Sequence, residues 1–136
     1  MRNIFWSMTL VVACLFGAAT AQAQKQVTTN NAIVPGEVWN DTDGNPINAH
    51  GGGILYHEGT YYWYGEYKKG KTILPEWATW ECYRTDVTGV SCYSSKDLLN
   101  WKFEGIVLPA VKDDQGHDLH TSKVLERPKV IYNPKT

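Results

Sequence analysis

Two glutamates stand beside runs of strand-forming residues and are the first candidates for chemistry. Glu66 ends the aromatic run 61–66, and Glu126 is followed by Arg127, Pro128 and a further β-type run. Hydrolysis of a glycosidic bond needs a pair of carboxyl groups, one as acid and the other as base or nucleophile. On local sequence alone, each glutamate is equally well explained as a solvated or ion-paired carboxylate. Arg127 could simply be the salt partner of Glu126.

Three further residues could contribute to a sugar site. The chain is rich in aromatic residues, with 6 Trp and 8 Tyr, and aromatic rings either pack a β-rich core or stack on the apolar faces of sugars. Trp80 and Tyr83 lie in an irregular stretch and could do either. His50 precedes a glycine run and could line the floor of a site, or make a structural hydrogen bond where the first strand begins.

Several other kinds of site are excluded by the motifs. The run Asp41-x-Asp43-x-Asn45 imitates the start of a calcium loop, but Gly52 stands where the bidentate Glu is required. The glycine run at 51–53 lacks the Lys and Ser/Thr of a phosphate loop. The formal net charge of −1 gives no basic surface for nucleic acid. We therefore expect no metal, no cofactor and no nucleic-acid partner.

The first residues indicate export. Arg2, a mostly apolar run at 4–19 and the small-x-small sequence at 21–23 predict a signal peptide over 1–23, too short for a membrane span. A lipoprotein site at Cys14 is the less favoured alternative, and the protein is predicted to be secreted or periplasmic. In such a compartment Cys82 and Cys92 form either a disulfide or two buried thiols.

The elements that position these residues are predicted to be all β. A hairpin is expected from 54–56 and 61–67 around a Gly-containing turn at 57–59. Further strands are expected at 90–94, 101–108 and 126–132. Residues 95–99 read as a serine-capped helical turn, while 74–86 and 112–122 read as loops. The strand–turn–strand–loop pattern is repeated about twice and is typical of propeller blades. Because Asn133-Pro134 opens a turn with no strand after it, we expect residues 24–136 to be a truncated domain.

Three blocks of the sequence resemble glycoside hydrolase family 43, closest to the branch that includes exo-β-1,3-galactanases. They are DTDGNPINAHGGGILYHEGTYYWYGEYK at 41–68, GVSCYSSKDLLNWKFEGIVL at 89–108 and LERPKVIYNPKT at 125–136. The Ser-Lys-Asp-Leu-Leu-Asn-Trp segment is shared by several five-bladed propellers. The His-Gly-Gly-Gly and Leu-Glu-Arg-Pro-Lys-Val segments are much more specific.

The resemblance implies a five-bladed β-propeller, of which this chain holds the first two or so blades, and an inverting mechanism. Glu126 matches the carboxylate that orients the general acid and raises its pKa. Glu66 matches a residue that holds hydroxyls of the terminal galactose. The usual first-blade base is replaced by Ala49-His50-Gly51, as in the galactanase-like branch. The general acid is expected in a later blade.

The sequence therefore predicts a glycosidase that removes terminal sugar from a plant-type polysaccharide, as an exo-β-1,3-galactanase, monomeric when complete and inactive as this chain alone. Two alternatives stay open. One is an arabinosidase or xylosidase of the same family. The other is a propeller that binds glycans without catalysis.

Overall fold

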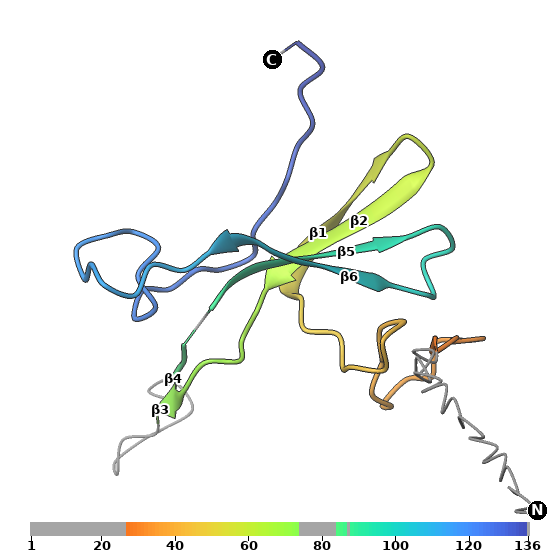
Figure 1. Ribbon diagram of the computed structural model, residues 1–136, viewed down its shortest axis with the longest axis horizontal. Helices are drawn as coiled ribbons and strands as arrows, with labels where there is room; N and C mark the ends of the chain where they lie inside the picture. Colours follow the sequence, from red (N-terminus) through yellow and green to blue (C-terminus); the bar gives the residue numbers. More distant parts are fainter. Residues whose placement is uncertain (1–26, 74–83, 87, 136) are drawn as a thin grey trace, which may run out of the picture.

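A four-stranded antiparallel sheet forms the centre of the computed structural model, which describes residues 27–73, 84–86 and 88–135 (Figure 1). Its strands are hydrogen-bonded in the order β1 (His50–His57), β2 (Thr60–Glu66), β5 (Gly89–Ser95) and β6 (Lys102–Pro109). A separate ribbon pairs β3 (Thr72–Ile73) with β4 (Arg84–Thr85). The expected all-β class is confirmed. The leader at 1–23, Trp80, Cys82 and Tyr83 lie outside the described residues.

The β1–β2 hairpin closes through a tight two-residue turn. His57 pairs with Thr60, and the turn residues Glu58 and Gly59 both have left-handed backbones, with φ of 45° and 72°. Positive φ at both central residues matches the right-handed twist of the flanking strands. The predicted hairpin is confirmed, as is the predicted strand at 90–94, which lies within β5, and the predicted strand at 101–108, which coincides with β6 except at Trp101.

The core lies against one face of this sheet. Trp63 and Tyr93 are cross-strand partners, and the Trp101 ring packs edge-on against Trp63 at a centroid distance of 5.4 Å. Tyr93 and Trp101 are almost completely buried. Trp39 also packs against this cluster from the preceding loop. Because side chains alternate along a strand, Tyr62 and Tyr64 point to the other face.

The turn between β5 and β6 is an irregular loop and not a helix. As predicted for a capping serine, Ser95 Oγ accepts the N–H of Leu98 at 2.9 Å. However, Leu98 has φ of 63°, a left-handed conformation that cannot continue a right-handed helix. The Asp97 carboxylate instead accepts the N–H groups of Leu99 and Asn100, and these bonds lower the pKa of Asp97. These hydrogen bonds hold the loop in the conformation that places Trp101 in the core.

The expected strand at 126–132 does not form, and that prediction was wrong. The segment approaches β1 without a backbone ladder (Figure 1). Two local features oppose strand pairing at the start of the segment: Pro128 has no N–H to donate, and Arg127 has φ of 48°. The segment still follows β1 in the same direction. Lys129 contacts Gly51 near the start of β1, and the centroid of the Tyr132 ring lies 4.2 Å from that of His57 at the end of β1.

Candidate functional site

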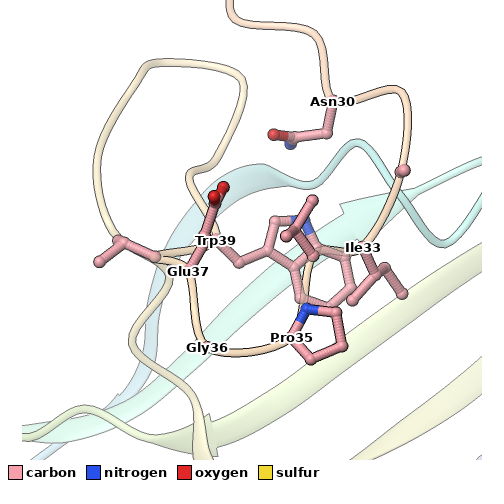
Figure 2. Close-up of a pocket in the computed structure, with 9 residues that line it drawn as sticks. Asn30, Ile33, Pro35, Gly36, Glu37 and Trp39 are labelled. Carbon is pink, nitrogen blue, oxygen red and sulfur yellow. The ribbon is translucent and has the colours of Figure 1, made fainter.

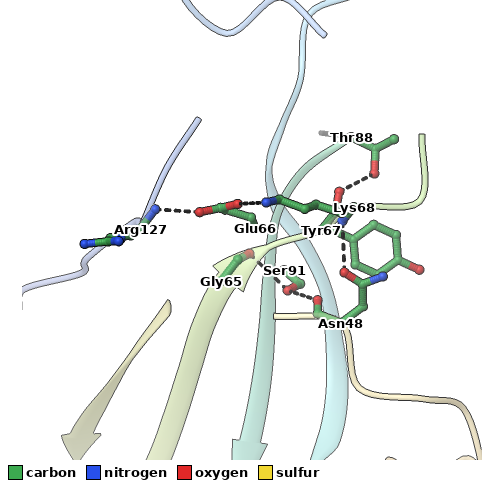
Figure 3. A network of polar contacts seen from close by, with 8 residues as sticks. All are labelled: Asn48, Gly65, Glu66, Tyr67, Lys68, Thr88, Ser91 and Arg127. Carbon is green, nitrogen blue, oxygen red and sulfur yellow. Dashed lines mark hydrogen bonds and ion pairs between the residues drawn. The ribbon is translucent and has the colours of Figure 1, made fainter. Parts of the chain in front are cut away.

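The carboxylate of Glu66 lies at the end of β2 and is buried, with 3% of the residue exposed. Its Oε1 accepts the backbone N–H of Arg127 at 2.6 Å (Figure 3). Its Oε2 lies 2.8 Å from the Lys68 ammonium. Burying a carboxylate is costly unless it is paired, and here one cation and one backbone amide provide the compensation.

The second oxygen of Glu66 retains acceptor capacity. Oε2 is buried and forms an ion pair with the Lys68 ammonium at 2.8 Å. A carboxylate oxygen carries two lone pairs, so this ion pair leaves room for one more donor. A carboxylate oxygen accepts strongly from hydroxyl groups. The arrangement therefore suits a group that receives a hydrogen bond from a polyhydroxylated ligand.

The structure brings the second candidate glutamate to the same end of the sheet. Glu126 directly precedes Arg127, whose amide is bonded to Glu66. The Glu126 side chain is exposed, and among the described residues no ion pair joins it to Arg127, which leaves its carboxylate available. Left-handed backbone at a residue other than glycine stores strain and is often found at functional sites, and Arg127 has this conformation.

His50 is the third candidate near this point. It begins β1, and its Cα partner across the hairpin is Glu66. Its side chain is exposed. The register therefore sets the histidine beside the carboxylate, at the rim of the same sheet end. Trp80 and Tyr83, the two aromatic candidates, fall outside the described residues, and their roles stay predictions.

A network of hydrogen bonds that the sequence analysis missed holds the backbone on either side of Glu66. Asn48 is its centre: its side-chain Oδ1 accepts the N–H of Lys68 at 2.9 Å, and its carbonyl accepts from Ser91 Oγ at 2.7 Å. Ser91, fully buried, also donates to the Gly65 carbonyl at 3.1 Å. The network thus ties Gly65, on one side of Glu66, to Ser91 of β5, and Lys68, on the other side, to Asn48 (Figure 3). No sequence signal would have indicated it, because Asn48 and Ser91 are 43 residues apart.

The face of the sheet that carries Glu66 also carries a buried thiol. Cys92 is a free, buried cysteine paired with Tyr64 across the strands. Burial raises the pKa of the Cys92 thiol. Burial, with Cys92 nearby, raises the pKa of Tyr64 to about 12. Both groups are therefore neutral near pH 7 and serve packing.

A cavity of about 250 Å³ lies elsewhere, in the loop before β1. The loop at 30–39 curls around the Trp39 indole, with Ile33 and Pro35 beside it (Figure 2). The indole Nε1 donates to the Leu99 carbonyl at 2.9 Å, which explains the position of this ring. None of the three described candidates, Glu66, Glu126 and His50, lines this cavity.

The described part of the chain has neither a candidate metal-binding cluster nor a membrane-spanning helix. Residues 27–73, 84–86 and 88–135 contain no group of three or more His, Cys, Asp or Glu that could hold a metal ion. The same residues include no helix long and apolar enough to cross a membrane.

The fold of this chain is similar to solved structures of glycosidases of one family. A family 43 β-1,3-galactosidase, solved with galactodeoxynojirimycin, is 52% identical over 76% of this chain, with a TM-score of 0.60. The chain covers 26% of that protein. No protein-family model and no curated protein matches the chain. The chain is thus a homologue of glycoside hydrolase family 43 enzymes, which confirms the resemblance seen in the sequence.

The matches also fall in the galactanase branch of that family. The exo-β-1,3-galactanase of Phanerochaete chrysosporium, solved with galactose, is 41% identical over 76% of this chain, with a TM-score of 0.60. The exo-β-1,3-galactanase of Clostridium thermocellum is 42% identical over 76%, with a TM-score of 0.54. This chain spans 21% and 19% of those two proteins.

Proposed function

We propose that this chain is the first part of an exported, inverting exo-β-1,3-galactanase of glycoside hydrolase family 43. Its four-stranded sheet would be the first blade of a five-bladed propeller. The antiparallel order β1-β2-β5-β6 supports this, because propeller blades are four-stranded sheets. The course of 126–132 along β1 also supports it, since the innermost strand of a following blade would run beside the innermost strand of this one.

The observation that carries the proposal is the environment of Glu66. Its carboxylate is buried at the end of the sheet, its Oε2 can accept one more hydrogen bond beside the Lys68 ion pair, and it is bonded to the segment that contains Glu126. This arrangement occurs in a chain whose solved homologues include a galactanase with bound galactose and a galactosidase with a galactose-like inhibitor. A sugar hydroxyl is the donor that suits Oε2.

In the proposed reaction the two carboxylates do different work. Glu66 binds hydroxyls of the terminal galactose and fixes the sugar. Glu126 lies beside the general acid, which a later part of the protein supplies, and its negative charge disfavours ionisation of that acid. The acid therefore keeps its proton until it is transferred to the leaving oxygen. A water molecule, activated by a base that we do not assign, attacks the opposite face of the sugar.

The test uses the whole protein to which this chain contributes, incubated with β-1,3-galactan. We expect release of galactose from the chain ends, with the inverted anomer appearing first in proton NMR spectra. Glu126→Gln should lower kcat by roughly 100-fold or more, with an unchanged melting temperature. An unchanged kcat would remove Glu126 from the site.

The same assay separates the alternatives. Release of arabinose or xylose from their polymers, with no galactose from galactan, would support the other members of the family. Galactan binding without turnover would support a glycan-binding propeller.

A further inference from the structure

Lys129 makes two hydrogen bonds to the backbone of β1 that have no part in the proposed chemistry. Its ammonium donates to the carbonyl of Gly51 at 3.1 Å and to the carbonyl of Gly52 at 2.8 Å. These carbonyls belong to β1, while Lys129 belongs to the segment that follows Glu126. The contacts span 78 and 77 residues of sequence.

The structure of β1 explains why these carbonyls need a partner. β1 is the edge strand of the sheet, and its register with β2 shifts between His50 and Gly53. Edge strands and bulges leave backbone groups outside the ladder. A single flexible ammonium, which carries three donors, satisfies two of these carbonyls at once.

The glycine run makes room for the approaching segment. A methyl group at Gly51 would lie 3.0 Å from Glu66 Oε1 and 3.2 Å from the Arg127 side chain. A methyl group at Gly53 would lie 3.0 Å from the Lys129 stem. Any side chain at these positions would push the segment away from β1. The His-Gly-Gly-Gly sequence thus provides the surface on which residues 127–129 lie.

Together these contacts fix the segment at two points. The Arg127 amide is bonded to Glu66, and that amide belongs to the peptide that joins Glu126 to Arg127. Two residues further on, Lys129 is bonded to the start of β1. With only the first contact, the segment could pivot about the Arg127 amide. The second contact sets its direction and with it the position of Glu126.

We infer that Lys129 is a positioning residue, which holds Glu126 at a fixed place relative to Glu66 by binding the Gly51 and Gly52 carbonyls. This inference rests on the proposed function, because it concerns the carboxylate that orients the acid. Lys129 does not touch the sugar in this role. Its loss should therefore lower kcat and leave KM almost unchanged, since misplacement of a catalytic group by about 1 Å costs up to about 100-fold in rate.

The experiment compares three variants of the whole protein. Lys129→Met keeps the stem and removes the donors, and should lower kcat about 10- to 100-fold with KM within about twofold. Lys129→Arg restores donors and should recover most of the rate. Lys96→Met is the matched control, because Lys96 donates to the Gly59 carbonyl at 3.0 Å and to Thr60 Oγ1 at 2.6 Å, at the far end of the same hairpin. It should leave kcat unchanged.

A second readout is independent of activity. Backbone amides at 125–131 should exchange hydrogen faster in Lys129→Met than in wild type, while amides of β2 and β5 should not change. If the wild-type protein releases no galactose, the proposed function fails, and the exchange comparison alone decides whether Lys129 holds the segment. Unchanged exchange in Lys129→Met, or an equal loss of kcat in Lys96→Met, would overturn the inference.

Discussion

At the scale of single residues, the buried Glu66 carboxylate is stabilised by two partners. Lys68 gives an ion pair at one oxygen, and the Arg127 amide a hydrogen bond at the other. Removing one partner of a buried pair costs more than the pair itself contributes, because the remaining group stays buried and unsatisfied. Substitutions here should therefore affect both binding and stability.

Glu66→Ala should destabilise the folded protein by about 1–3 kcal/mol, because the Arg127 amide loses its acceptor. The Lys68 side chain is 37% exposed, so water replaces part of its lost ion pair. Glu66→Gln keeps an acceptor for the amide and should lose less stability. Urea denaturation of the whole protein measures both. The alanine variant should also raise the KM for galactan, and wild-type affinity would contradict a role in sugar binding.

The raised pKa of Tyr64 should make the stability of the folded protein depend on pH in the alkaline range. Burial raises the pKa of Tyr64 to about 12 in the folded protein, from an ordinary value of 10.0. Between pH 10 and 12 the unfolded chain loses this proton while the folded chain retains it, so unfolding is favoured as the pH rises. The contribution of Tyr64 is complete below pH 10 and is lost on going to pH 12.

Denaturation series between pH 9 and 12, for wild type and Tyr64→Phe, should show a shallower decline in the variant. Tyr93 keeps part of the slope in both proteins, because burial raises its pKa too. Identical slopes would contradict the assignment to Tyr64.

At the scale of the elements, the sequence predicted what local patterns determine. The hairpin β1–β2 followed from aromatic runs around Glu58-Gly59, and β5 and β6 from their strand-forming residues. The helical turn at 95–99 failed because of the Leu98 backbone, and the strand at 126–132 failed because of Arg127 and Pro128. Backbone conformations of this kind depend on tertiary contacts that a local pattern does not contain.

The sequence indicated the candidate site residues but not the geometry that joins them. Glu66 and Glu126 were found from their positions beside strands and from the family resemblance. The bond that connects their segments runs from a backbone amide to a carboxylate 61 residues away. Backbone donors carry no sequence signature, so neither this bond nor the Lys129 contacts could be foreseen.

Gly52 provides a test of the β1–β2 register. A methyl group there would overlap the Tyr64 carbonyl of the neighbouring strand, so Gly52→Ala must shift the backbone and should cost more than about 3 kcal/mol. Gly59→Ala is the matched control. Gly59 has φ of 72° with nothing within 4 Å of the added carbon, and the conformational cost alone should be about 1 kcal/mol. Thermal melting measures both, and equal losses would contradict the close packing at Gly52.

At the scale of the whole molecule, the described residues leave both faces of the sheet incompletely covered. Tyr93 is enclosed, but Ile54 and Tyr56 on the same face are 54% and 60% exposed, and Tyr64 on the opposite face is only partly covered. Apolar side chains also remain open to solvent, including Ile131, which is 88% exposed. A sheet of this kind is expected to pack against further layers, as a blade does in a propeller.

This exposed apolar surface gives the last prediction, which compares residues 24–136 alone with the whole protein. Because the general acid is proposed to lie in a later blade, the chain alone should release no galactose from β-1,3-galactan. Because both sheet faces are incompletely covered, it should bind the dye ANS, which reports exposed apolar surface. The whole protein should hydrolyse galactan and bind little dye. Turnover by the chain alone at the rate of the whole protein would contradict the propeller proposal, since the active site would then be complete within residues 24–136.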